Sequence, residues 1–337
     1  MPDYISVQTS FAFPLASVKP LDGLQSYRAH CLSATRSILH EPLRRRQRCS
    51  ACGSGLKSLG NVANLGYVEC PSCNSIFLHL IPASSSWADL LADVSHYRRS
   101  PEAFHRGITQ SRSENVYGPK IEWVQSTLRL QDVREPRLME VVTPPSDFTS
   151  LLQSSGSFTE ILTVDEMDLV MAGTSGQSLE RKQPHSSDGE NLVDVAVLLE
   201  SLDRVDDPTA LLRAVARRLA EGGLLFVTAL VCSGFDMRVL GLRNLYLYPP
   251  DRANCFSLRG LERLLKESGF TLLEVSTPGV LDLEIVQAHL RHDPSIPLST
   301  FERELLATQA ETHAAFQEFL QQHKMSSFAR IVGKKQP

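Results

Sequence analysis

Residues 191–230 read NLVDVAVLLESLDRVDDPTALLRAVARRLAEGGLLFVTAL, and this stretch decides the fold that we expect. Residues 195–199 form an unbroken apolar run, which is typical of a strand buried on both faces of a parallel sheet. Polar side chains follow from Glu200, where the carboxyl end of such a strand opens into a crevice. A second apolar run at 224–230 predicts another buried strand.

The segment between the two runs has the pattern of a helix. Asp207 and Pro208 indicate its start, because acidic residues and proline are favoured at the beginning of a helix. Apolar residues recur at helical spacing up to Leu219, and Gly222-Gly223 is expected to end the helix. The stretch therefore predicts a β-α-β crossover within an α/β domain of Rossmann type, with a mostly parallel sheet and flanking helices.

Composition restricts the class of protein. The chain has 337 residues, a formal net charge of −4, 42% hydrophobic and 21% charged residues, which is ordinary for a globular protein. The net charge argues against a protein that mainly coats nucleic acid. The sequence has no apolar run as long as a membrane span and no signal-peptide pattern at its start. We therefore expect a cytoplasmic protein.

Two cysteine pairs predict a metal site. Cys49 and Cys52 form one C-x2-C pair, and Cys70 and Cys73 form another after seventeen residues. This spacing is typical of a structural zinc site, in which four thiolates surround Zn²⁺ as a closed tetrahedron. We expect a small ribbon whose fold depends on the metal, not a catalytic centre. The alternatives are a redox dithiol or a chance pairing.

The order of elements at 191–230 resembles the second half of class I S-adenosylmethionine-dependent methyltransferases, from their fourth strand to their fifth. The resemblance implies that Glu200 faces the cofactor crevice; the alternative is a solvated strand end. Residues 246–257 (YLYPPDRANCFS), with the helix, Gly-Phe and strand that follow, resemble zinc-ribbon methyltransferases of the sugar and surface-polysaccharide kind. In that group an acid-His pair supplies a general base. Here the pair is Asp251-Arg252, so Asp251 is the catalytic candidate, and a structural Asp-Arg pair is the alternative.

The family's first strand and cofactor loop correspond to residues 137–146, RLMEVVTPPS. Glu140 matches the family's acidic position. The three glycines of the family pattern are replaced by Val142, Pro144 and Ser146, which do not adopt glycine conformations cheaply. Either this loop binds the cofactor in an altered way, or the domain has lost it.

Residues 158–164 (FTEILTV) predict the second strand, and Asp165 follows it. The resemblance implies that Asp165 holds the ribose hydroxyls of the cofactor; the alternative is a solvated strand terminus. Residues 172–190 are rich in glycine, serine and charge, and they predict a loop where the family has its third strand. The sheet is then one element short.

The chain divides into four expected parts. They are an N-terminal segment at 1–43, the zinc ribbon at 44–82, a helical connector at 83–135 that breaks at Gly118-Pro119, and a methyltransferase-like domain at 136–337. The last contains a helical insertion at 283–323, with a long helix predicted at 301–323, and ends in an antiparallel strand at 326–334.

Three functions follow. The first is an S-adenosylmethionine-dependent methyltransferase that acts on a small molecule or on a sugar or polysaccharide precursor. The second is a catalytically inactive, methyltransferase-like subunit that binds a protein partner. The third is a zinc-ribbon nucleic-acid binder, which only the arginine cluster at 44–48 supports. A homo-oligomer is a further prediction, because the helix at 301–323 carries an apolar stripe suited to the core or to a partner subunit.

Overall fold

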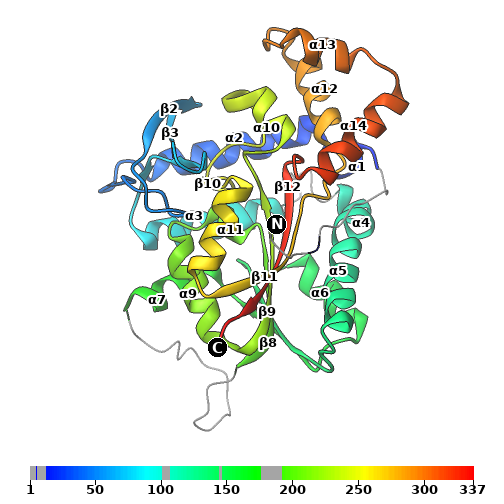
Figure 1. Cartoon of the computed structure of the whole chain (residues 1–337). Helices are drawn as coiled ribbons and strands as arrows, with labels where there is room; N and C mark the ends of the chain where they lie inside the picture. Colours follow the sequence, from blue (N-terminus) through cyan, green and yellow to red (C-terminus); the bar gives the residue numbers. More distant parts are fainter. Residues whose placement is uncertain (1–4, 6–12, 101–106, 144–145, 176–191) are drawn as a thin grey trace.

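The computed structural model describes residue 5 and residues 13–100, 107–143, 146–175 and 192–337 (Figure 1). A six-stranded sheet in the order β11-β12-β9-β8-β6-β7 forms the centre of the described molecule. Strands β6 to β9 are parallel, whereas β12 is antiparallel to both of its neighbours, as expected for the last strand. The bounds are Arg137–Val141 (β6), Glu160–Val164 (β7), Val193–Leu199 (β8), Leu219–Leu230 (β9), Phe270–Ser276 (β11) and Phe328–Lys335 (β12).

Helices cover both faces of this sheet, which confirms the predicted α/β class (Figure 1). Strand residues alternate between the two faces: Leu138 and Val195 pack with α5 and α6, while Met139 and Ala196 belong to the core on the other side. That second face is covered by α7, α9 and α11 (Figure 1). The bounds are Gly118–Leu130 (α5), Asp147–Ser155 (α6), Glu166–Ser175 (α7), Pro208–Arg218 (α9) and Leu258–Glu267 (α11).

The glycine pair in the decisive stretch has a different role from the predicted one. Helix α9 already ends at Arg218, and Leu219 begins β9 opposite Val193. The expectation that Gly222-Gly223 ends the helix was therefore wrong. Gly222 has a φ of +70°. The register between β8 and β9 shifts between the pair formed by Val193 and the pair formed by Val195. The pair forms an irregularity within the strand, where a positive φ suits glycine.

The cysteine-rich segment folds as an antiparallel sheet that includes a strand from the main domain. Strands β2 (Lys57–Val62), β3 (Leu65–Glu69) and β4 (Ile76–Leu78) are joined by β10 (Asn254–Cys255), which pairs with β4. A separate two-stranded sheet is formed by Arg44–Arg45 (β1) and Leu80–Ile81 (β5). Because of the β4-β10 pairing, the ribbon holds the segment that contains Asp251 and Arg252.

The connector helices run on where a break was predicted. Thr109–Arg112 (α4), a π-helical turn at Ser113–Tyr117 and α5 follow one another directly, so the break expected at Gly118-Pro119 is absent from this described stretch. A proline in a regular helix clashes with the carbonyl four residues earlier, and the wider π-helical turn relieves that clash. The remaining N-terminal helices are Leu15–Val18 (α1), Leu21–Ser37 (α2) and Ser84–Arg98 (α3).

The insertion after β11 consists of three helices at one end of the molecule (Figure 1). They are Asp282–His292 (α12), Thr300–Leu306 (α13) and Ala310–Gln322 (α14), so the single helix predicted at 301–323 is divided. Short elements elsewhere are Ser201–Arg204 (α8), Phe235–Leu240 (α10) and a 3-10 turn at Gly241–Arg243. Within the described ranges, no helix combines the length and apolar character that a bilayer span requires.

Candidate functional site

A cleft lies at the carboxyl ends of the parallel strands. The chain leaves β6 toward β7 on one side and then crosses to β8 on the other, so the strand order reverses between β6 and β8. Open α/β sheets bind ligands at such a switch point. A cavity of about 520 Å³ is present there, lined by Val142 after β6 and by Leu199 at the end of β8. Its volume is within the roughly 300–1,000 Å³ range of ligand pockets.

Glu140 lies at this edge of the sheet but is engaged internally. Its side chain is buried, and Ser146 Oγ donates a hydrogen bond to Oε1 at 2.8 Å, while the Thr149 hydroxyl donates to Oε2. Ser146 also caps α6, because its Oγ accepts hydrogen bonds from the backbone N–H groups of Phe148 and Thr149. Burial raises the pKa of Glu140, and the two hydroxyl hydrogen bonds oppose that rise. Glu140 thus binds the first turn of α6 through Ser146 and Thr149; Pro144 lies outside the described residues.

Asp165 lies at the end of β7 and caps the next helix. Its Oδ1 accepts hydrogen bonds from the backbone N–H groups of Met167 at 2.8 Å and Asp168 at 3.3 Å. Among the described residues, Glu140 and Glu200 both line the cavity, whereas Asp165 does not. The ribose-binding role of Asp165 stays a prediction. Of the loop predicted at 172–190, the described residues 172–175 are instead the end of α7, so the prediction was wrong there, and the rest lies outside the described residues.

Glu200 and Asp203 share one arginine. Arg252 Nη2 donates to Glu200 Oε2 at 2.6 Å, and Arg252 Nη1 lies 3.6 Å from Asp203 Oδ2. Burial alone would raise the pKa of Glu200, but the positive charge of Arg252, helped by Lys120, outweighs it and holds this pKa well below its ordinary value. Arg252 contacts Asp251 through the backbone carbonyl at 2.8 Å, so its ion pairs are with the two acids that follow β8.

Asp251 lines the same cavity and is paired with an arginine that the sequence did not single out. Arg98, at the end of α3, lies 3.2 Å from both carboxylate oxygens of Asp251. Burial would raise the pKa of Asp251, but Arg98, Arg204 and Arg252 together lower it. A carboxylate with a lowered pKa is a weak base, so the predicted catalytic role of Asp251 is left with little driving force for proton abstraction.

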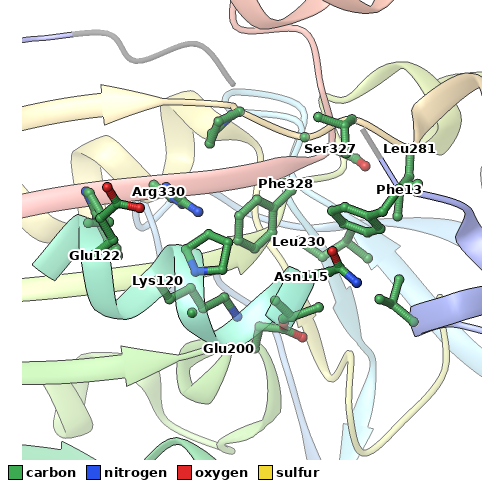
Figure 2. Close-up of a pocket in the computed structure, with 18 of the residues that line it drawn as sticks. Phe13, Asn115, Lys120, Glu122, Glu200, Leu230, Leu281, Ser327, Phe328 and Arg330 are labelled. Carbon is green, nitrogen blue, oxygen red and sulfur yellow. The ribbon is translucent and has the colours of Figure 1, made fainter. Parts of the chain in front are cut away.

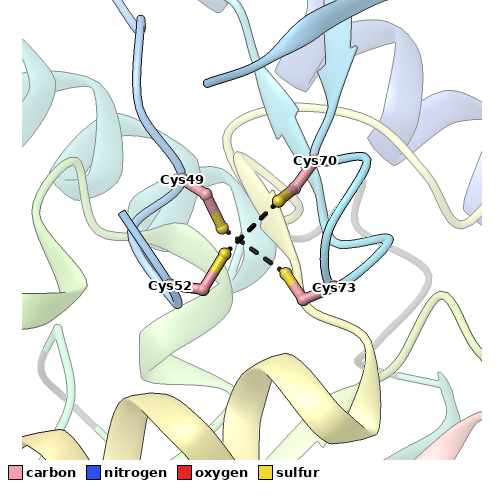
Figure 3. A group of neighbouring side chains, drawn as sticks. All are labelled: Cys49, Cys52, Cys70 and Cys73. Atoms are coloured by element: carbon pink, nitrogen blue, oxygen red, sulfur yellow. Dashed lines mark hydrogen bonds between the residues drawn. The ribbon is translucent and has the colours of Figure 1, made fainter. Parts of the chain in front are cut away.

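The four cysteines predicted to bind zinc are brought together. Their Sγ atoms all lie within 4.8 Å of one another, with 3.5 Å between Cys49 and Cys73 and 3.4 Å between Cys52 and Cys70 (Figure 3). Thiolates that bind zinc at about 2.3 Å in a tetrahedron stand roughly 3.8 Å apart. The backbone N–H of Ala51 points to Cys49 Sγ at 3.4 Å, which suits a thiolate. The donor set therefore fits Zn²⁺ held by Cys49, Cys52, Cys70 and Cys73.

A second cavity, of about 880 Å³, extends from the first between α5 and the strands β11 and β12. Figure 2 shows its labelled lining, which includes apolar side chains such as Leu230 and Phe328. Lys19, Arg112 and Lys120 line both cavities, so the two cavities meet at these side chains. Sequence patterns did not single them out, because a lone cation next to a helix start is usually solvated.

Lys120 is the most buried of these cations. Its side chain is 4% exposed, and it extends from α5 toward Glu200 (Figure 2). Burial lowers the pKa of Lys120 to about 8; the negative charge of Glu200 opposes this, and the positive charges of Arg112, Arg330 and Lys19 add to it. The folded protein therefore holds a costly ammonium group at neutral pH.

Replacing Lys120 by methionine is expected to raise the free energy of unfolding at neutral pH by up to about 3 kcal/mol, because no ammonium group is then buried. The pKa of Lys120 is about 8 when folded against 10.5 ordinarily, so the folded state binds fewer protons within that pH window. The free energy of unfolding of the wild type rises with pH between these two pKa values. The variant is therefore more stable than the wild type by the full amount below about pH 8, and the difference disappears as the pH rises to 10.5. Urea denaturation at several pH values measures this difference; Lys57→Met, on the exposed surface of β2, is the control. A pH-independent difference would contradict the expectation.

The fold and the cleft define a doubly wound α/β domain with a ligand crevice at its topological switch point. Residues 117–275 match the family model described as "Methyltransferase domain". A comparison with curated proteins gives no match.

Solved structures of methyltransferases are similar to the chain at low sequence identity. One is the Burkholderia thailandensis 1,6-didemethyltoxoflavin-N1-methyltransferase with bound 1,6-didemethyltoxoflavin and S-adenosylhomocysteine, at 12% identity and a TM-score of 0.41, covering 83% of this chain and 100% of that one. Another is the plantazolicin methyltransferase BpumL in complex with a triazolic desmethylPZN analog and S-adenosylhomocysteine, at 12% identity and a TM-score of 0.41, covering 75% and 98%.

Proposed function

We propose that this chain is an S-adenosylmethionine-dependent methyltransferase that acts on a small molecule, with the cofactor in the cleft at the ends of β6 and β8. The observation that carries the proposal is the cavity at the switch point, whose walls at the ends of β6 and β8 belong to the segment 117–275 that a methyltransferase-domain model matches. The sugar or polysaccharide character of the acceptor remains part of the proposal, and so does the structural zinc.

The residues present fit an adenosyl cofactor in space, though they surround it differently from the family pattern. Val142 and Ser146, at two of the family's glycine positions, line the cavity, and Glu200 lines it from the end of β8. When bound, the cofactor supplies an electrophilic methyl group. The chain's contribution is to orient the acceptor for in-line attack and to exclude water.

An inactive binding subunit is the second candidate, and the internal engagement of the predicted carboxylates favours it. Both oxygens of Glu140 accept hydroxyl hydrogen bonds, and Glu200 pairs with Arg252. In this case the cleft holds no adenosyl group, and titration with S-adenosylhomocysteine distinguishes the two candidates.

Titration of the whole protein with S-adenosylhomocysteine, followed by calorimetry, is expected to give saturable heat with one site per chain. Val142→Phe is expected to abolish this binding, because Val142 is half-buried on the wall of the cleft and a phenyl ring fills space that the ligand needs. Thermal unfolding of Val142→Phe should stay close to that of the wild type, since its backbone N–H keeps its hydrogen bond to Val164.

Arg213→Ala, on the exposed side of α9, is the control and should bind like the wild type. Absence of heat and of any thermal shift with the wild type would remove the methyltransferase proposal and leave the inactive subunit. Unchanged affinity in Val142→Phe would show that the ligand binds elsewhere.

A further inference from the structure

We propose that the substrate carries an anionic group, a phosphate or a carboxylate, and that this group binds where Lys19, Arg112 and Lys120 meet between the two cavities. This inference rests on the proposed function, since it names the class of substrate for that cleft. It is carried by the charges and the contacts at the junction.

The junction has more positive than negative charge. The charged residues that line both cavities are Lys19, Arg112, Lys120, Arg252 and Glu200. Glu200 forms its ion pair with Arg252 at 2.6 Å, and Lys19 and Lys120 feel its negative charge only from a longer distance. Within the described part of the chain, none of Lys19, Arg112 and Lys120 forms an ion pair.

The Lys120 ammonium group lies near two aromatic rings, and Glu200, toward which it extends, is paired with Arg252. Its Nζ lies 5.4 Å from the ring centre of Phe328 and 6.0 Å from that of Tyr117, and the described residues offer it no hydrogen-bond acceptor. Burying an unpaired charge is costly, and an anionic ligand group beside the ammonium would offset that cost. The side chain points into the larger cavity (Figure 2).

Lys19 and Arg112 keep donors available to the same space. Lys19 Nζ lies 4.9 Å from the ring centre of Tyr246, and burial lowers its pKa too. Arg112 donates to the carbonyl of Val18 at 3.1 Å and to the hydroxyl of Tyr117 at 3.4 Å, both of which are neutral. A ligand anion is the group that neutralises these cations without competing with an existing salt bridge.

The extent of the larger cavity favours an anion that belongs to the methyl acceptor and not to the cofactor. The larger cavity continues past the junction along β12, where Leu230 and Phe328 line it, and residues of β6 are not part of its described lining. An anion at the junction would hold a molecule that extends into this second cavity.

The test is a calorimetric titration of the whole protein with inorganic phosphate, at constant ionic strength kept with sodium chloride. The wild type should bind phosphate, and Lys120→Met should weaken binding about tenfold or more, as expected for loss of a charge-assisted hydrogen bond. Lys120→Arg should retain most of the affinity, and the exposed control Arg213→Met should match the wild type. Phosphate binding near pH 8 should also take up protons in the wild type, and fewer in Lys120→Met, because Lys120 has a pKa of about 8 and gains its proton when the anion binds.

Failure of phosphate to bind, or equal affinity in the wild type and Lys120→Met, would overturn the inference. S-adenosylhomocysteine titrations separate it from the proposed function. If both variants bind S-adenosylhomocysteine like the wild type while phosphate affinity falls in Lys120→Met, the substrate assignment stands. An equal loss for S-adenosylhomocysteine would assign the cations to the cofactor carboxylate and overturn it. Phosphate binding without any S-adenosylhomocysteine binding would refute the proposed function and the substrate assignment, leaving only an anion site.

Discussion

Cys70→Ser is expected to abolish stoichiometric zinc and to unfold the cysteine ribbon, with the largest loss of stability of any single substitution proposed for this chain. Cys70 is fully buried, and its Sγ lies in the cluster of four cysteines. A structural zinc site contributes on the order of 10 kcal/mol to the folding of a small ribbon, because the unfolded chain has no preformed site and the free energy of metal binding adds to that of folding.

The effect should reach the cleft. Strand β4 of the ribbon pairs with β10, and the Tyr67 hydroxyl donates to the carbonyl of Arg252 at 2.9 Å. Metal analysis by mass spectrometry, thermal unfolding and ligand titration should therefore all change together. Cys31→Ser is the control, since Cys31 is equally buried but lies outside the cluster. Zinc absent from the wild type, or a Cys70→Ser protein as stable as Cys31→Ser, would contradict the metal site.

Arg252→Met is expected to destabilise the folded protein by about 3 to 5 kcal/mol, as found when one member of a buried ion pair is removed. Arg252 is 8% exposed and bonds to Glu200 while lying 3.6 Å from Asp203 Oδ2. Asp203 is fully buried, and burial raises its pKa to about 8 although Arg252 opposes the rise. Without Arg252 the remaining acids lose their compensating charge.

Urea denaturation at neutral pH measures the effect, and Arg263→Met is the matched control. Arg263 forms an exposed pair with Glu267 at 2.6 Å, and such surface pairs contribute little. Adding Glu200→Gln to Arg252→Met should recover part of the lost stability, because Glu200 is the acid that stays ionised at neutral pH and loses its partner. Equal losses in Arg252→Met and Arg263→Met would show that the buried pair does not stabilise the protein.

Local sequence patterns predicted the first strand and helix of the β-α-β unit correctly. The apolar run that became β8 and the start signal at Asp207-Pro208 were predicted from local patterns, and the structure confirms both. The C-x2-C spacing likewise predicted the cluster of four sulfur atoms, because two residues between the cysteines let both sulfur atoms of a pair face one metal ion. The end of α9 was missed by a few residues, since the Gly222-Gly223 signal fits a helix stop and a strand irregularity equally well.

The candidate site was predicted less completely. Glu140, Glu200 and Asp251 line one cavity, as a crevice at the strand ends requires, but each is bonded to a partner that lies far along the chain or on another element. Arg98 is a clear case: it is 153 residues from Asp251 and ends an ordinary helix, so no local pattern marks it.

The sequence by itself determined the α/β class, the strand and helix order around 191–230 and the cysteine cluster, because period, capping and ligand spacing act over a few residues. Only the tertiary structure decided which charges face one another. Lys19, Arg112 and Lys120 come to one junction because α5 packs against the sheet near the N-terminal helices. The strength of a charge depends on burial and on neighbours across space, and neither is written in the local sequence.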